Sequence, residues 1–188
     1  MREYRGTLEG QGLRVAIAVS RYNESVTRGL LEGALAALAE CGVPTDAVGV
    51  AHVPGALELP IAARELALGG RWDAVIALGA VIRGETDHYA YVCAESARGC
   101  AAVALETGVP VAFGVLTCET LAQARDRSTT PSKNKGGEAA RSAVETANLL
   151  RSLRRDAPGA ASARGDERAA GAPRRGASRA APARGANP

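Results

Sequence analysis

One stretch of the chain decides its fold class: Ala74-Val75-Ile76-Ala77-Leu78-Gly79-Ala80-Val81. None of these residues carries a charged or polar side chain. A strand of a parallel sheet is covered on both faces, so its sequence is continuously apolar instead of alternating between apolar and polar residues. The stretch therefore predicts a buried strand of a parallel sheet.

The sequence on either side of this strand repeats the pattern. Further strands are predicted at residues 13–19, 47–53 and 111–116. The strands alternate with five predicted helices. The first lies between Asn23, which is placed to cap it, and Gly42, which ends it. The others are predicted at residues 58–68, 88–107, 119–126 and 137–153. This alternation predicts a three-layer α/β/α sandwich with a four-stranded parallel sheet and right-handed crossovers.

Composition and charge exclude several classes of protein. Residues 156–188 contain six of the 23 Lys and Arg residues and three of the 20 Asp and Glu residues. Residues 1–155 therefore contain 17 basic and 17 acidic residues. This part of the chain has no excess of positive charge that would indicate binding to nucleic acid. No apolar run approaches the roughly 18 residues of a membrane span, and residues 1–5 lead into no apolar signal segment. Aromatic residues make up only 3% of the chain, so we expect a core of Ala, Val, Leu and Ile.

The cysteines show no metal-site spacing. They form no Cys-x-x-Cys pair, and with the two histidines they match no zinc pattern. We therefore expect no metal site. The cysteines are interpreted as reduced thiols of a cytoplasmic protein, most of them buried: Cys41, Cys93, Cys100 and Cys118.

The last 33 residues differ from the rest of the chain. Residues 156–188 include 12 Ala and 6 Arg but no Leu, Ile, Val or aromatic residue. Such a segment buries too little apolar surface to offset the entropy lost on ordering. We expect one domain at residues 1–155 and a disordered tail at 156–188, with a weak anion-binding or cargo-binding arm as the alternative function of the tail.

The chemistry is expected in the segments that follow the strands, because ligands of parallel α/β sheets bind at the carboxyl ends of the strands. The segment at residues 82–88 is the most informative. Gly84 allows close approach of a ligand to the backbone, Thr86 offers a hydroxyl, and a helix beginning near His88 offers N–H groups and its positive dipole end, which favours an anion such as phosphate. The segment is neither a Walker A loop nor a dinucleotide fingerprint.

Several polar or aromatic residues have two interpretations each. His88 could be a neutral imidazole ready to act as a general base, or a helix-start histidine bonded to local backbone. Glu58 could meet a polar ligand or cap its helix, and Tyr22 could stack on a flat ring or pack against the protein. Arg127 and the lysines near residue 134 could pair with phosphate or belong to a solvated loop. His52, inside a strand, is expected to be a buried core histidine.

Five motifs occur in a fixed order along the chain. They are Ser20-Arg21-Tyr22-Asn23, residues 53–60, residues 78–89, residues 113–117 and Asn134-Lys135-Gly136-Gly137. Together they resemble the lumazine synthase family over about residues 1–153, and the motif at 78–89 is the most specific. The resemblance implies a flavodoxin-like fold and the penultimate step of riboflavin biosynthesis. Such enzymes condense 5-amino-6-(D-ribitylamino)uracil with 3,4-dihydroxy-2-butanone 4-phosphate to 6,7-dimethyl-8-ribityllumazine, releasing phosphate and water, without a metal or organic cofactor.

The resemblance also implies roles for residues of this chain. His88 would transfer protons, Tyr22 would stack on the pyrimidine, and Glu58 would accept hydrogen bonds from the ribityl chain. The other implied substrate-binding residues are Asn23; Ala56 and Leu57 near the ribityl chain; the backbone of Ala80, Val81 and Ile82 at the pyrimidine; Gly84, Glu85 and Thr86 at the phosphate; and Phe113, Arg127 and Lys135.

The family resemblance implies an assembly as well. Phe113 and Arg127 would reach the site from a neighbouring subunit, so a homo-oligomer with sites at its interfaces is expected. A pentamer is the expected unit, a 60-subunit icosahedral capsid is left open, and riboflavin synthase is a candidate partner. The sequence departs from the family pattern at three positions. Tyr22 replaces Phe or Trp, which keeps the stacking ring, and Leu57 replaces a frequent Phe beside the ribityl chain. Pro131 alters the loop before Asn134, which bears on the capsid.

Two alternatives to an active synthase stay open. One is a non-catalytic shell that keeps the fold, although Glu58, Thr86, His88 and Arg127 are all present. The other is a flavodoxin-like module that holds a flavin or lumazine without turnover. A phospho-receiver domain is excluded, because no acidic cluster follows the first strand.

Overall fold

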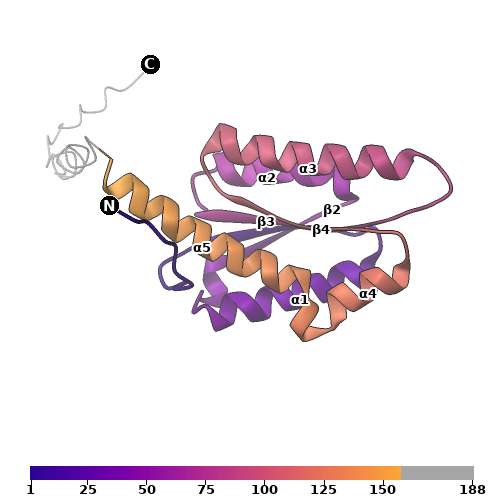
Figure 1. The fold of residues 1–188 in the computed structure, drawn as a ribbon, viewed down its shortest axis with the longest axis horizontal. Coiled ribbons are helices and arrows are strands. Elements are labelled where there is room, and N and C mark those ends of the chain that lie inside the picture. The colour runs from indigo at the N-terminus through magenta and orange to yellow at the C-terminus, as the bar shows by residue number, and fades with distance from the viewer. Residues whose placement is uncertain (158–188) are drawn as a thin grey trace, which may run out of the picture. The chain divides into compact units, whose positions relative to one another are not determined.

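Four parallel strands form the sheet of the computed structural model. They are β1 (Val15–Ser20), β2 (Val48–Val53), β3 (Ala74–Ile82) and β4 (Val111–Cys118), in the order β2-β1-β3-β4 (Figure 1). β1 and β3 occupy the centre, and their residues are buried almost throughout. The predicted fold class is therefore confirmed, and the run that led to it lies in a central strand.

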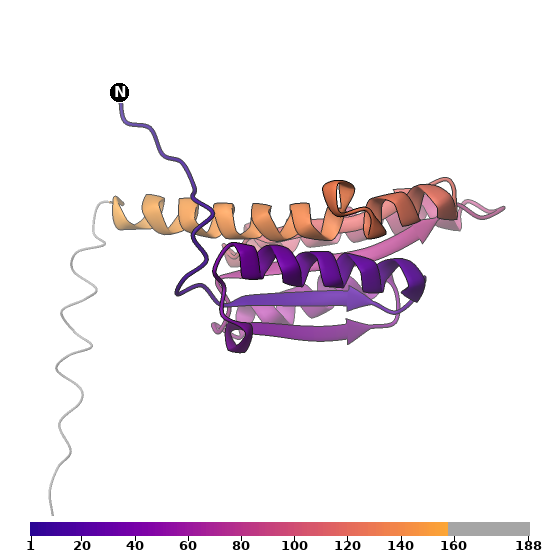
Figure 2. The ribbon, with the colours of Figure 1, turned by 90° about the horizontal axis from the view of Figure 1, so that it is seen from below.

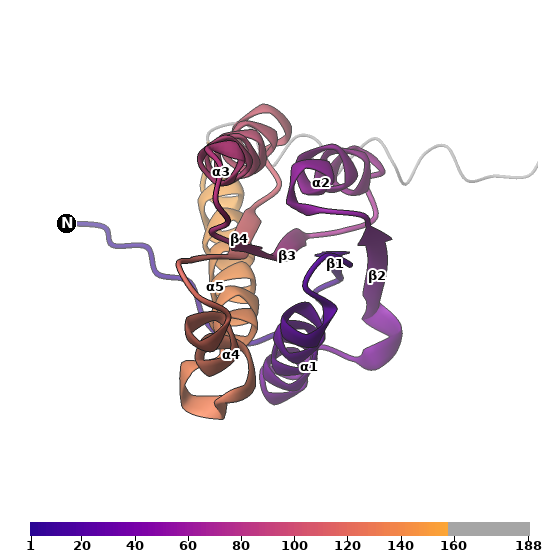
Figure 3. The same ribbon diagram turned by 90° about the vertical axis from the view of Figure 1, so that its right-hand side faces the viewer.

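Five helices within residues 1–157 cover the two faces of this sheet. α2 (Leu59–Leu68) and α3 (His88–Thr107) lie on one face, and α1 (Glu24–Glu40), α4 (Leu121–Thr129) and α5 (Lys135–Arg155) lie on the other (Figure 3). Short 3₁₀ turns are present at Thr45–Ala47, Ala56–Glu58 and Pro131–Lys133. α1 and α5 run side by side along their face (Figure 2). The layers are therefore helix, sheet and helix.

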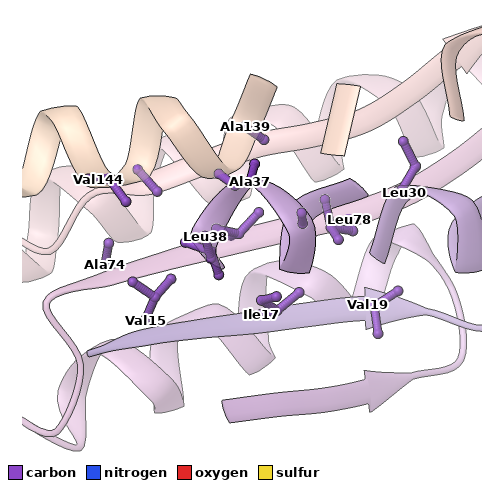
Figure 4. Close-up of a cluster of buried hydrophobic side chains, with 14 of the residues drawn as sticks. Val15, Ile17, Val19, Leu30, Ala37, Leu38, Ala74, Leu78, Ala139 and Val144 are labelled. Carbon is purple, nitrogen blue, oxygen red and sulfur yellow. The ribbon is translucent and has the colours of Figure 1, made fainter. Parts of the chain in front are cut away.

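The largest core cluster lies between the sheet and the layer of α1 and α5. Ile17 and Leu78 from the strands are fully buried against Leu30 and Leu38 of α1 and Val144 of α5 (Figure 4). The buried members of the clusters among the described residues are Ala, Val, Leu and Ile with two cysteines, and one aromatic residue, the half-buried Trp72, packs against them. The expected composition of the core is confirmed.

The structure describes residues 1–157. Residues 1–153 form one compact unit, and Arg154 begins a second one, of which only the end of α5 and the two residues after it are described. The predicted tail lies outside the described residues from 158 onward, so its disorder and the proposed boundary at residue 155 stay predictions. No helix among residues 1–157 has both the length and the apolarity needed to cross a membrane.

Several element boundaries differ from the predicted ones, and local capping explains the shifts at two helix starts. β1 begins at Val15 instead of residue 13, and α4 covers Leu121–Thr129 instead of 119–126. The latter shift follows from Thr120, whose hydroxyl accepts a hydrogen bond from the backbone N–H of Gln123 and so caps α4. α5 begins two residues earlier than predicted, at Lys135, because Asn134 accepts a hydrogen bond from the N–H of Gly137.

The prediction that His52 is a core histidine was wrong. β2 is an edge strand, and the side chain of His52 is exposed. An edge strand has only one neighbour in the sheet, so fewer of its side chains are covered, even though the sequence of β2 is mostly apolar.

The cysteines are all free thiols, but their burial differs. Cys100 and Cys118 are buried, whereas Cys41 and Cys93 are half-buried. Burial raises the pKa of the Cys100 thiol to about 11. This thiol binds its proton more tightly in the folded protein than in the unfolded chain, so stability that is present below pH ~9 is lost as the pH rises toward 11.

We expect this loss to reach roughly 3 kcal/mol, because each unit of pKa corresponds to about 1.4 kcal/mol. Urea unfolding of the wild type and of Cys100→Ala at pH 8, 9.5 and 11 measures it. The variant is less stable at pH 8, but its stability falls less steeply with pH. Equal slopes for the two proteins would contradict the assignment to Cys100.

Candidate active site

A pocket of about 330 Å³ lies at the carboxyl edge of the sheet. It contains most of the residues that the sequence nominated, although they come from three separate strand ends and one helix. Its lining consists of Tyr22, Asn23, Gly55, Ala56, Leu57, Glu58, Ala80, Val81, Ile82, His88 and Val92. The carboxyl ends of parallel strands meet at one edge, which brings these segments together.

Hydrogen bonds join the three strand ends below the pocket. The N–H of Arg21, after β1, donates to the carbonyl of Val53 at 2.9 Å, and the N–H of Tyr22 donates to the carbonyl of Pro54 at 3.0 Å. On the other side, Asn23 Nδ2 donates to the carbonyl of Ala80 in β3 at 2.8 Å. The loop after β1 is thereby fixed to both neighbouring strands.

Asn23 has an unusual backbone conformation, and its side chain is held by a hydrogen bond. It is the one residue other than glycine with a positive φ, 59°, in the part of the chain that the structure describes. Asparagine tolerates this left-handed conformation better than most residues. It immediately precedes α1, but its side chain does not cap the helix as predicted, because the amide reaches Ala80 instead. Asn23 therefore positions the wall of the pocket.

Glu58 serves the local structure as well as the pocket. Its Oε2 accepts a hydrogen bond from the N–H of Gly55 at 2.8 Å, which fixes the carboxylate at the start of α2. Gly55 in turn lies against the ring of Tyr22: a Cβ at this position would come within 2.8 Å of Tyr22 Cδ2. A side chain at Gly55 would therefore displace the aromatic ring that faces the pocket.

Sequence reasoning missed two residues of the lining, Gly55 and Val92. Gly55 stands within the motif at residues 53–60, but nothing in the sequence shows that Tyr22 packs on it. Val92 could have been predicted from the sequence, because it follows His88 by four residues and so lies on the same face of α3.

His88 is the first residue of α3 and is exposed at the pocket. Within the described structure no side chain caps α3, so its first turn presents backbone N–H groups at the positive end of the helix. The exposed turn that leads into the helix contains Gly84, Glu85 and Thr86, which do not line the pocket itself. A Cβ at Gly84 would meet no atom within 4 Å, so this turn is open to a ligand.

The remaining nominated residues lie in a second pocket of about 400 Å³. It extends along β4, α4 and α5, and its lining includes Phe113, Arg127 and Lys135. Arg127 Nη1 donates to the carbonyl of Gln123 at 3.0 Å, and Lys135 Nζ donates to both carboxylate oxygens of Glu138 at 2.8 and 2.7 Å. Within one chain, therefore, these residues do not join the pocket of His88.

The fold and the first pocket define a class of protein. It is a parallel α/β sandwich that can bind a small ligand at the carboxyl edge of its sheet, with an imidazole, a carboxylate and an aromatic ring around one cavity. Among the residues described, no three His, Cys, Asp or Glu side chains are grouped as a metal site.

A family model for 6,7-dimethyl-8-ribityllumazine synthase matches residues 12–151 of the 188. The chain therefore belongs to the 6,7-dimethyl-8-ribityllumazine synthase family. The members of this family are transferases of riboflavin biosynthesis. The resemblance based on the five motifs is confirmed, and the matched residues contain both pockets.

Proposed function

We propose that this protein condenses 5-amino-6-(D-ribitylamino)uracil with 3,4-dihydroxy-2-butanone 4-phosphate to 6,7-dimethyl-8-ribityllumazine. One observation carries the proposal: a single pocket gathers Tyr22, Glu58 and His88, which can stack on a ring, accept hydrogen bonds from hydroxyls and transfer protons. Family membership supplies the class of reaction.

The pyrimidine substrate is proposed to bind between Tyr22 and the end of β3. The Tyr22 side chain is 69% exposed, which leaves its ring available for stacking. The backbone of Ala80, Val81 and Ile82 can recognise the polar edge of the pyrimidine. Glu58 is proposed to accept hydrogen bonds from the ribityl hydroxyls, since a carboxylate has acceptor sites beyond the one that Gly55 occupies.

The phosphate of the second substrate is proposed to bind at the turn Gly84-Glu85-Thr86 and the first turn of α3. Backbone N–H groups at a helix start favour an anion. His88 is then adjacent to the reacting carbons. The substrate amine attacks the butanone carbonyl, and water leaves as the imine forms. Elimination then breaks the carbon–oxygen bond to phosphate and leaves an enol, which becomes a carbonyl. The ribitylamino nitrogen closes the second ring onto this carbonyl with loss of a second water, and His88 moves the protons.

Much of the rate enhancement is expected to come from holding two substrates together. Correct positioning of two reactants can contribute roughly 7–11 kcal/mol. The pocket is walled by side chains fixed through Asn23 and Glu58, which suits this task.

The second pocket supports a homo-oligomer. Phe113 and Arg127 are proposed to complete the site of a neighbouring copy in the cytoplasm, with the Arg127 guanidinium pairing with the phosphate. The 40% exposure of Phe113 suits a residue that a neighbour covers. We propose a pentamer as the unit, and riboflavin synthase as a partner that consumes the product.

The reaction is tested by mixing the protein with both substrates and following lumazine absorbance and fluorescence. We expect product well above the uncatalysed background. Background rates together with measurable binding of the pyrimidine would overturn the proposal and favour a binding module.

Shared sites are tested by combining two impaired variants. We expect His88→Ala and Arg127→Ala each to be impaired, because each lacks one half of every site. When the two are co-expressed, a random ring of copies regains about a quarter of its sites, in which His88 and Arg127 come from different subunits. No recovery in mixed oligomers would show that each chain builds its own complete site.

A further inference from the structure

We propose that Arg83 is a positioning residue, which braces the turn Gly84–Asp87 against the end of β4 and so fixes His88 in the pocket. The proposal deepens the proposed function and rests on it for its catalytic consequence. Its structural basis is independent of the reaction.

Three contacts of Arg83 carry the inference. Its backbone N–H donates to the carbonyl of Cys118, the last residue of β4, at 2.9 Å. Its Nε lies 2.7 Å from the carboxylate of Glu119. Its guanidinium carbon lies 4.2 Å from the centre of the Tyr89 ring, an arrangement typical of a cation–π contact.

The Tyr89 ring lies between α3 and the end of β4. Burial raises the pKa of its hydroxyl, and the side chains of Cys93, one turn further along α3, and of Thr117 in β4 are close enough to influence that pKa. The guanidinium of Arg83 therefore rests on a ring that lies beside the same strand end as Glu119. Residues 84–88 connect Arg83 to Tyr89, so both ends of the exposed turn are held through one side chain.

This arrangement argues against Arg83 as a phosphate ligand. One edge of its guanidinium is occupied by Glu119 and one face by Tyr89, and the carboxylate compensates its charge. The side chains of Arg83 and Glu119 are 45% and 57% exposed. Exposed ion pairs contribute little to global stability, so variants at Arg83 are expected to fold.

Lysine is the informative substitution, because it keeps the charge but lacks the planar fork and the flat face. We expect Arg83→Ala and Arg83→Lys both to lower kcat about 10- to 100-fold, the scale expected when a catalytic group is slightly misplaced. KM for the phosphate substrate changes less than threefold, and Glu119→Gln shows a smaller loss of the same kind. The matched control is Arg98→Ala, which removes an arginine paired with Glu95 on α3, away from the turn.

Hydrogen exchange separates this proposal from the reaction. In Arg83→Ala we expect the amides of residues 83, 90 and 91, which donate to the carbonyls of Cys118 and Asp87 on either side of the turn, to exchange about tenfold faster. This holds whether or not the wild type makes lumazine, while the melting temperature changes little. Unchanged exchange at these three amides would overturn the proposal. So would full rescue of kcat by lysine together with a large rise in KM for Arg83→Ala, because that result identifies a phosphate ligand.

Discussion

His88→Ala is expected to lower kcat by about 10²- to 10⁴-fold, the usual contribution of a general acid or base. The imidazole is the one titratable nitrogen of the first pocket's lining, and it lies at the start of α3 beside the turn proposed to bind phosphate. Activity is not abolished, because the pocket still brings the two substrates together. Steady-state kinetics of lumazine formation measure the loss, and fluorescence titration of the pyrimidine checks that binding survives.

The chain offers a matched control in its other histidine. His52 is exposed on the edge strand β2 and does not line the pocket, so His52→Ala is expected to retain the kcat of the wild type. A His88→Ala variant that keeps more than a third of the wild-type kcat would remove His88 from the proton-transfer role.

Gly136→Ala is expected to destabilise the fold by about 3 kcal/mol, near the upper end of the usual cost of overpacking. Gly136 lies in the first turn of α5, against the backbone of α1. A Cβ there would lie 2.0 Å from the carbonyl oxygen of Leu30 and 2.7 Å from its carbon. Backbone atoms cannot rotate away as a side chain can, so the two helices have to separate. Urea unfolding at neutral pH measures the change.

The neighbouring glycine is the control for this variant. A Cβ at Gly137 would lie 3.3 Å from the carbonyl oxygen of Gly33 and 3.4 Å from Arg141 Nη1, a tight but tolerable environment. Both positions are helical, so both gain the preference for alanine over glycine, about 0.5–1 kcal/mol. We expect Gly137→Ala to change stability by less than about 1 kcal/mol. Equal effects of the two substitutions would contradict the close contact at Leu30.

The sequence was informative about the fold because β1 and β3 are buried on both faces. Their unbroken apolar runs distinguish a parallel sheet from an antiparallel one. The same signal misled at β2, whose sequence is nearly as apolar although the strand lies at the edge and exposes His52. Strand order depends on contacts between distant segments, and no local pattern encodes it.

The strand ends and motifs predicted which residues belong to the site, but not how these residues are grouped in space. Strand ends and short motifs nominated Tyr22, Glu58 and His88, which the structure places around one pocket. Strand ends alone could not show that Phe113 and Arg127 lie in another pocket of the same chain, a separation that only the family resemblance implied. Interactions that depend on three-dimensional proximity were also invisible, such as the amide of Asn23 bonded to Ala80.

The close contact at Gly136 links the two pockets of a chain. α1 begins beside Asn23 in the first pocket, and at Leu30 its backbone touches Gly136, which directly follows Lys135 of the second pocket. In a ring that joins the second pocket of one copy to the first pocket of the next, this backbone contact would set the repeat distance from one reaction centre to the next. The distance between neighbouring active sites would then depend on the packing of α1 against α5 within each subunit. Every correctly formed interface would reproduce that distance.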